Sequence, residues 1–251
     1  MKNFKFLAAV CCMAAVFAAC EKNEPSDNTN GNGVNTEQND GTNTDQNDGN
    51  SNSGNNNATD TNGHDYVDLG LSVKWATCNV GATKPEEYGN YYAWGETEPK
   101  TTYSWSTYKW CNGSDDTLTK YNTNGGFGTV DNKTLLDLSD DAARANWGGA
   151  WRMPTDEEWK ELRNNCAWTW TTLNGINCYK VTGTNGNFIF LPAAGCRNND
   201  GSYDTDEYGY YWSSSLGTDE PCKACFVYFY SDDVYRGNTY RFFGRSVRPV
   251  L

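Results

Sequence analysis

Histidine is almost missing from this chain: its 251 residues contain one, His64. Imidazole is the usual general base of Ser–His catalysis and the commonest protein ligand of transition metals. Because no histidine follows residue 64, triad chemistry and most metal-assisted hydrolysis lose their usual groups. Asp232 and Asp233 are adjacent carboxylates, but neighbouring residues of a strand face opposite sides and cannot share one substrate. The sequence therefore disfavours an enzyme.

Basic residues are also scarce, with 20 Lys and Arg against 32 Asp and Glu and a net charge of −12. Nucleic-acid binding depends on basic surface that neutralises phosphates, so nucleic acid is excluded as a partner. The mean hydropathy of −0.79 is typical of disorder, whereas 10 Trp and 16 Tyr are typical of a folded chain. Both observations can hold only if one part of the chain is disordered and another part is folded.

Residues 1–19 form the first part, a signal peptide with Lys2 and Lys5 before an apolar run that is too short to span a bilayer. The stretch "FAAC" that ends at Cys20 resembles a bacterial lipobox, which implies cleavage before Cys20 and acylation of its thiol. The alternative is an ordinary signal peptide cut near Ala19. With acylation, the protein touches the membrane only through its lipid anchor, and we expect it on the surface of the outer membrane.

Residues 20–64 form the second part, in which Asn, Asp, Gly, Thr and Ser dominate and no aromatic residue occurs. Such a segment cannot bury enough apolar surface to offset its ordering entropy. We expect a disordered tether that spans roughly 35 Å. His64, at its end, is interpreted as linker rather than ligand.

Residues 65–251 form the third part, which is aromatic and glycine-punctuated. The segments 138–147 and 154–166 predict helices, the second with Thr155 and Glu158 as a capping box and with Trp159 and Leu162 on one face. Asn174-Gly175 lies between alternating residues and predicts a two-residue hairpin turn. Strands are expected within 66–82, 89–96, 187–195, 209–216 and the C-terminal stretch. This pattern predicts an α+β domain of many short antiparallel strands with about two helices.

Three blocks carry a resemblance: "WGGAWRMPTDEEWKEL" (147–162), "YYWSSSL" (210–216) and "GRSVRPV" (244–250). They resemble the Fibrobacter major paralogous domain of surface lipoproteins from gut-dwelling Gram-negative anaerobes. In the same order they are similar to formylglycine-generating-enzyme-like proteins, a branch of the C-type-lectin-like fold. The resemblance implies that the first block opens a helix and the last closes the sheet. The segment from about 97 to 135 is not covered by the enzyme-like pattern.

The sequence offers two further candidate sites, a cysteine pair and a calcium-binding loop. The enzyme branch uses a C-terminal cysteine pair, but Cys222 and Cys225 differ from that pattern in spacing and flanking residues. The oxygen-rich loop 198–207 has the composition of a Ca²⁺ site, although it lacks EF-hand spacing and the Glu-Pro-Asn type motif of animal lectins. A solvated loop is the favoured interpretation, so no cofactor or metal ligand is assigned.

Cysteine pairing stays open, because the exported part has an odd number of thiols. If Asn174-Gly175 is a two-residue turn, Cys178 lies opposite Thr171 and Cys166 lies about 16 Å away along the strand. That separation excludes a Cys166–Cys178 bridge. The seven cysteines are Cys78, Cys111, Cys166, Cys178, Cys196, Cys222 and Cys225.

The C-terminal stretch combines two sets of residues. Val227, Phe229, Ser231 and Val234 have the pattern of packed positions, and the residues between them are expected to face outward. The residue types at the outward positions all have codons that can be reached from the Asn codon AAC by changing only adenines. Targets of diversity-generating retroelements carry this pattern. A static paralogue of such a target fits equally well. The interleaved positions are Gly217, Asp219, Cys222, Cys225, Phe226, Tyr228, Tyr230, Asp232, Asp233, Tyr235, Gly237, Asn238, Thr239, Tyr240, Phe242 and Phe243.

Exposed aromatics among Gly, Asn and Asp are the composition of binding surfaces. We therefore expect an adhesin-like surface lipoprotein that binds an extracellular glycan, protein or phage, with an enzyme of the formylglycine-generating type and a structural or fimbrial-tip component as alternatives. The predicted ligand-binding residues are Asp219, Tyr228, Tyr230, Asp232, Asp233, Tyr235, Asn238, Tyr240, Phe242 and Phe243.

Overall fold

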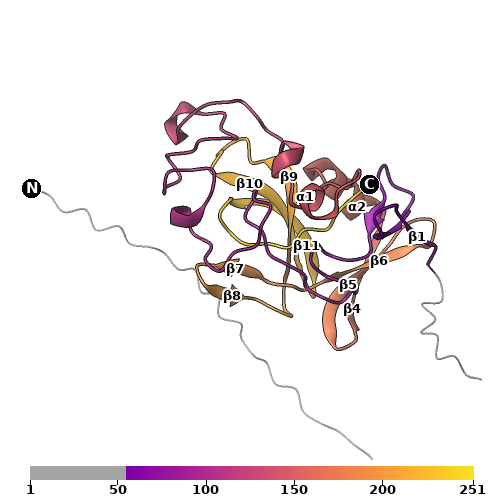
Figure 1. Ribbon diagram of the computed structural model, residues 1–251. Helices are drawn as coiled ribbons and strands as arrows, with labels where there is room; N and C mark the ends of the chain where they lie inside the picture. The colour runs from indigo at the N-terminus through magenta and orange to yellow at the C-terminus, as the bar shows by residue number, and fades with distance from the viewer. Residues whose placement is uncertain (1–54) are drawn as a thin grey trace, which may run out of the picture. The chain divides into compact units, whose positions relative to one another are not determined.

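The computed structural model describes residues 55–251 and contains mostly short antiparallel strands with two α-helices (Figure 1). This confirms the α+β prediction in its coarse form. The signal peptide, Cys20 and the tether up to residue 54 lie outside the described residues. Within 55–251, none of the helices has the length and apolar character needed to cross a bilayer. The helices are α1 (Ala142–Trp147) and α2 (Asp156–Asn165), with 3₁₀ turns η1 (Trp105–Thr107), η2 (Gly125–Phe127) and η3 (Leu138–Asp140).

The strands form three sheets of three strands and one of two, all antiparallel, in the orders β1-β2-β3, β4-β5-β6, β11-β10-β9 and β7-β8. Their bounds are β1 (Asn57–Thr59), β2 (Asp65–Val67), β3 (Trp75–Ala76), β4 (Ala167–Leu173), β5 (Ile176–Thr182), β6 (Phe188–Pro192), β7 (Cys196–Asn198), β8 (Gly201–Tyr203), β9 (Gly209–Leu216), β10 (Lys223–Tyr230) and β11 (Asp233–Tyr240).

Local sequence signals placed the second helix and the first hairpin correctly. Helix α2 begins after Thr155, whose hydroxyl accepts from the Glu158 N–H while the Glu158 carboxylate accepts from the Thr155 N–H. The β4–β5 turn is Asn174-Gly175, with φ of 50° and 86°, values that both residue types tolerate. Its register pairs Thr171 with Cys178, as predicted.

One predicted strand is absent, and the segment that follows it has little regular structure. Residues 89–96 form no strand, although Tyr92 makes an isolated bridge with Arg245. The stretch from 97 to 135 winds through loops and two 3₁₀ turns (Figure 1). Tyr103, Tyr108 and Tyr121 are each at most 3% exposed and hold these loops to the domain. Buried rings, rather than the hydrogen bonds of a sheet, attach these loops to the domain. The alternation of residue types along the sequence does not reveal this kind of attachment.

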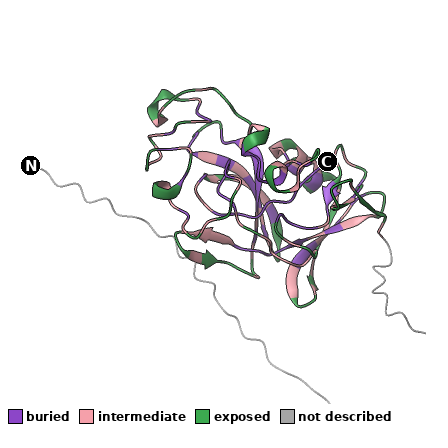
Figure 2. Cartoon of the chain, viewed as in Figure 1, coloured by how far each residue is buried: buried purple, intermediate pink, exposed green. Residues whose placement is uncertain are grey.

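Both faces of the sheet β11-β10-β9 contact a hydrophobic core, and each combines buried with half-buried residues (Figure 2). One face packs Val227, Phe229 and Val234 against Trp159 and Leu162 of α2. The other face belongs to a second core that holds Ala224, Phe226, Trp212, Trp94 and Val247. The tryptophans Trp75, Trp94, Trp151, Trp159 and Trp212 are all fully buried, whereas Trp147 is half-buried.

The start of the folded part is earlier than predicted. Asn55 exchanges two side-chain hydrogen bonds with the backbone of Phe188, and β1 pairs with β2. The Asp60 carboxylate accepts from Trp151 Nε1 at 2.7 Å and from the His64 N–H at 2.8 Å, and the His64 ring stacks on Trp147 at 3.9 Å. The prediction that the tether extends to residue 64 is therefore wrong for residues 55–64. Polar side chains attach this segment, so its lack of apolar residues was misleading.

Substitution of Asp60 by Ala should lower the free energy of unfolding by about 1–3 kcal/mol, because it leaves the buried Trp151 indole without its acceptor. Asp200→Ala is the matched control, since Asp200 is exposed, and it should change stability by less than about 0.5 kcal/mol. Chemical denaturation of the two variants measures the difference. Equal stabilities would mean that the Asp60 contacts do not stabilise the fold.

Candidate functional site

Strand β10 separates the C-terminal residues into two faces, because successive side chains of a strand alternate. Val227 and Phe229 are fully buried, and Val234 of β11 is 5% exposed. Phe229 pairs with Gly209 of β9. A Cβ atom at position 209 would lie 2.0 Å from the Phe229 ring, so only glycine fits there. The inward register was therefore predicted correctly for these positions. Ser231 is an exception: it lies exposed in the β10–β11 turn, where no strand remains to pack it.

The opposite face of this sheet carries a set of stacked rings that we call the tyrosine face. Tyr228 and Tyr235, paired across β10 and β11, stack at 5.1 Å and 18°. Tyr230 stacks on Tyr235 at 5.9 Å, and Tyr210 of β9 stacks on Tyr228 at 6.2 Å. The rings are half-buried rather than fully exposed, because each covers its neighbours. The tyrosine face consists of Tyr208, Tyr210, Phe226, Tyr228, Tyr230 and Tyr235.

Two hydroxyls of the tyrosine face have raised pKa values. Hydrogen bonding to Tyr230, together with desolvation and the nearby Asp233 carboxylate, raises the pKa of Tyr235. Burial, and then the hydrogen bond to Asp204 at 2.8 Å, raises the pKa of Tyr210. The Tyr210 and Tyr235 phenols therefore stay protonated at neutral pH. The face combines ring carbon with hydroxyl groups, which suits a ligand that offers both C–H surface and polar groups.

A second group of rings, which we call the aromatic corner, lies at the other end of the sheet. Trp105 from the 97–135 loops packs against Tyr240 at 5.8 Å and Phe242 at 5.0 Å. Phe242 also contacts Phe243 at 4.5 Å. Tyr240 is 38% exposed, and the Lys223 ammonium lies 5.6 Å from its ring. The aromatic corner consists of Trp105, Tyr240, Phe242 and Phe243.

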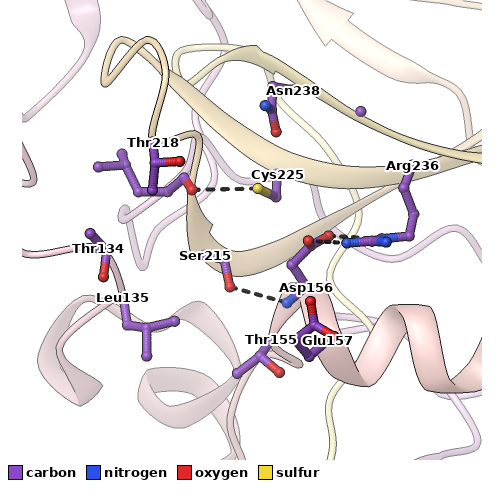
Figure 3. A pocket seen from close by; sticks show the side chains of 12 residues that line it. Thr134, Leu135, Thr155, Asp156, Glu157, Ser215, Thr218, Cys225, Arg236 and Asn238 are labelled. Atoms are coloured by element: carbon purple, nitrogen blue, oxygen red, sulfur yellow. Dashed lines mark hydrogen bonds and ion pairs between the residues drawn. The ribbon is translucent and has the colours of Figure 1, made fainter.

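The remaining predicted residues do not join one surface. Asp232 lies in the β10–β11 turn and Asp233 begins β11, beside the tyrosine face. Asp219 lies in the loop between β9 and β10, at the opposite end of a strand that is about 23 Å long. Asn238 projects from the other face of β11, into a cavity (Figure 3).

That cavity has a volume of about 680 Å³ and lies between β10, β11 and the start of α2 (Figure 3). Its floor holds an ion pair of Arg236 with Asp156, whose N–H donates to the Ser215 hydroxyl at 3.1 Å. These three polar groups are therefore already engaged with one another. The cavity is lined by Thr134, Leu135, Thr155, Asp156, Glu157, Ser215, Leu216, Thr218, Cys225, Arg236, Gly237 and Asn238.

Cys222 and Cys225 do not face one cleft. Cys222 is 1% exposed in the core beside the 97–135 loops, whereas Cys225 borders the cavity and donates to the Leu216 carbonyl at 3.4 Å. Burial raises the pKa of Cys225 to about 12, so the reactive thiolate is scarce at neutral pH. All seven cysteines in the described chain are free thiols.

The loop 198–207 uses its carboxylates locally. Asp206 accepts the Asn177 N–H at 2.7 Å, and Asp204 accepts from the Tyr210 hydroxyl. Over residues 55–251, no group of three or more His, Cys, Asp or Glu side chains is placed to hold a metal ion.

Sequence reasoning missed several residues of these surfaces: Tyr208, Tyr210, Trp105 and Arg245. Tyr208 and Tyr210 precede or begin β9, and alternation along "YGYYWSSSL" places Tyr208 and Tyr210 on one side, which was a usable signal. Trp105 comes from a loop whose position no pattern indicated. No family model matches the chain, and comparison with curated proteins and with solved structures finds no similar protein.

Phe229→Ala should lower the free energy of unfolding by about 3–5 kcal/mol, since it empties a fully buried position. Tyr240→Ser, at a position that is 38% exposed, should lower it by about 0.5 kcal/mol or less. Thermal and chemical unfolding of both variants measures the two effects. The opposite order would mean that Phe229 is not a core position and that the assigned register of β10 is wrong.

Native Cys225 should resist iodoacetamide at pH 8, because with a pKa of about 12 only about one thiol in ten thousand is ionised at that pH. The denatured chain is the control and should react at every cysteine. Mass spectrometry of timed samples measures the modification. Alkylation of native Cys225 as fast as in the denatured chain would indicate an activated thiol and favour the enzyme alternative.

Proposed function

We propose that this chain is a surface-displayed, adhesin-like lipoprotein whose C-terminal aromatic surface binds an extracellular ligand. The observation that carries the proposal is the tyrosine face: six rings on adjacent strands, of which five remain half-exposed. Tyrosine supplies large contact area at low cost in side-chain entropy. Soluble domains rarely leave such a group of rings accessible unless it recognises something.

The proposed fold is C-type-lectin-like, as the three sequence blocks imply. The first block opens helix α2, and the second is most of β9. The last block pairs Val250 with both Trp75 and Arg152, so it joins the two ends of the folded part. These placements support the resemblance. Acylation of Cys20 would anchor this domain to the outer membrane, with the residues before 55 as the connection.

A glycan ligand is favoured over a protein partner by the shape of the surface. The rings lie nearly parallel, with angles of 18° to 21° between the Tyr210, Tyr228, Tyr235 and Tyr230 planes. Rings that stack this closely cover one another's faces, so they present their edges and phenol groups outward, where the C–H groups and hydroxyls of a sugar can contact them. Protein partners are instead bound by anchors that insert into well-packed pockets.

Binding of the full-length protein to an array of immobilised glycans tests the proposal. Tyr228→Ser and Tyr235→Ser should each weaken the binding of every recognised glycan by roughly tenfold or more, since buried aromatic anchors dominate interface energies. Tyr203→Ser is the matched control, because Tyr203 is 48% exposed on β8 and outside the tyrosine face. A loss of binding in Tyr203→Ser equal to that in the other two variants would contradict the assignment of this face.

A further inference from the structure

Arg245 carries a guanidinium that the fold encloses without a partner. The residue is 5% exposed, and its backbone exchanges hydrogen bonds with Tyr92. Its Nε and Nη1 are enclosed and donate to nothing. No carboxylate within residues 55–251 forms an ion pair with it. Nη2 is the one guanidinium nitrogen that is not among these enclosed atoms.

Aromatic rings surround this guanidinium on several sides. Its centre lies 4.0 Å from the Phe226 ring, 4.6 Å from Tyr210, 5.1 Å from Trp212 and 5.7 Å from Phe243. The attraction of a cation to ring faces stabilises the charge in part. Burial lowers the pKa of Arg245 to about 10, so the side chain is still positively charged at neutral pH.

The other buried arginines of the C-terminal segment are treated differently by the fold. Arg248 donates four hydrogen bonds to backbone and side-chain oxygens. Arg241 has two enclosed nitrogens without a partner, Nε and Nη2, but its Nη1 donates to the carbonyls of Lys120 and Tyr121. Of these three arginines, only Arg245 donates no side-chain hydrogen bond within residues 55–251. A buried charge without hydrogen-bond partners is costly, and native proteins rarely keep one without a reason. Arg245 therefore differs from its neighbours in being available to an external acceptor.

The position of Arg245 connects the two aromatic groups. Phe226 and Tyr210 belong to the tyrosine face, and Phe243 belongs to the aromatic corner. Phe226 stacks on Tyr228 at 5.4 Å, so a ligand that lies on the tyrosine face has this cation at the edge of its footprint. In a chain with a net charge of −12, an unpaired cation in this place is a specific feature rather than background.

We propose that Arg245 and the tyrosine face together bind a sugar that carries a carboxylate, a hexuronic or a nonulosonic acid. This inference rests on the proposed function and names its ligand class. The pyranose ring packs on the outward edges of the Tyr228 and Tyr235 rings, and the carboxylate accepts a charge-assisted hydrogen bond from Nη2 of Arg245. The low dielectric of the aromatic surroundings strengthens this pairing. A neutral sugar would leave the cation unpaired, so the site discriminates by charge.

The test measures the affinity of the full-length protein for trigalacturonic acid and for the α-methyl glycoside of N-acetylneuraminic acid, each against its own methyl ester. The ester removes the charge and keeps the ring. At least one acid should bind tenfold or more tightly than its ester, and this preference should weaken as ionic strength rises. This comparison uses the unsubstituted protein alone. Equal affinity for acid and ester, or no binding of either acid, would overturn the inference.

Arg245→Met keeps the apolar stem and should reduce the preference for acid over ester to about onefold, while Arg245→Lys should retain part of it. Arg197→Met is the matched control. Nε of Arg197 also has no hydrogen-bond partner. The backbone of Arg197 forms a bridge with Gly244, the neighbour of Arg245. Its side chain therefore lies on the opposite side from Arg245, over the Tyr91 ring. Arg197→Met should leave the preference unchanged. A cooperative thermal transition in each variant shows that it is folded.

The two proposals fail in distinguishable ways. If neutral oligosaccharides bind in a way that Tyr228→Ser abolishes and Arg245→Met does not, the binding face stands and the acidic-sugar site is overturned. If the acids bind through Arg245 but Tyr228→Ser has no effect, the tyrosine face is overturned. Binding of an acidic peptide such as poly-glutamate, but of neither acidic sugar, would also overturn the inference.

Discussion

The buried guanidinium of Arg248 is the contact on which the rest of the domain depends. It donates to the Asn79 side chain, to the carbonyls of Ala76 and Thr77, and to the carbonyl of Phe190, each at 2.9 Å. These acceptors lie near the beginning of the folded part and in its later middle, and Arg248 joins them to its end. Loop-rich domains have few strand-to-strand hydrogen bonds to hold such segments together. Here the N–H donors of one fully buried guanidinium replace them.

This constraint explains why the aromatic surface is where it is. The closing segment must place Arg248 in the core and Val250 beside Trp75 and Arg152. Arg245, three residues earlier, is then held next to β9 and β10 by the bridge to Tyr92 and by the pairing of Ser246 with Tyr211. The scaffold thus fixes both the rings and the cation at the rim of the same sheet. A binding site on rigid strands keeps its geometry better than one on loops.

Sequence reasoning succeeded where the signal is local. The capping box of α2, the Asn174-Gly175 turn and the alternation of Val227 and Phe229 each depend on a few adjacent residues. It failed where distant segments decide the outcome. Residues 55–64 looked like tether because side-chain hydrogen bonds, not apolar contacts, attach them. Trp105 reaches the aromatic corner from a loop, and the buried neighbours of Arg245 meet only in three dimensions, so neither could be read from spacing.

The burial of the interleaved positions also limits how far this surface can vary. Tyr228, Tyr230 and Tyr235 are half-exposed and can change without emptying the core. Phe226 is 8% exposed and forms the closest ring contact of Arg245, and Cys222 is 1% exposed in another core. An Asp or Asn at Phe226 would replace that ring contact with a buried polar group. Adenine-directed diversification of every interleaved codon would therefore produce many unstable variants, whereas a static paralogue keeps these two positions. The half-exposed tyrosines can vary while Phe226 and Arg245 stay constant, which would alter specificity for the sugar ring and preserve recognition of its charge.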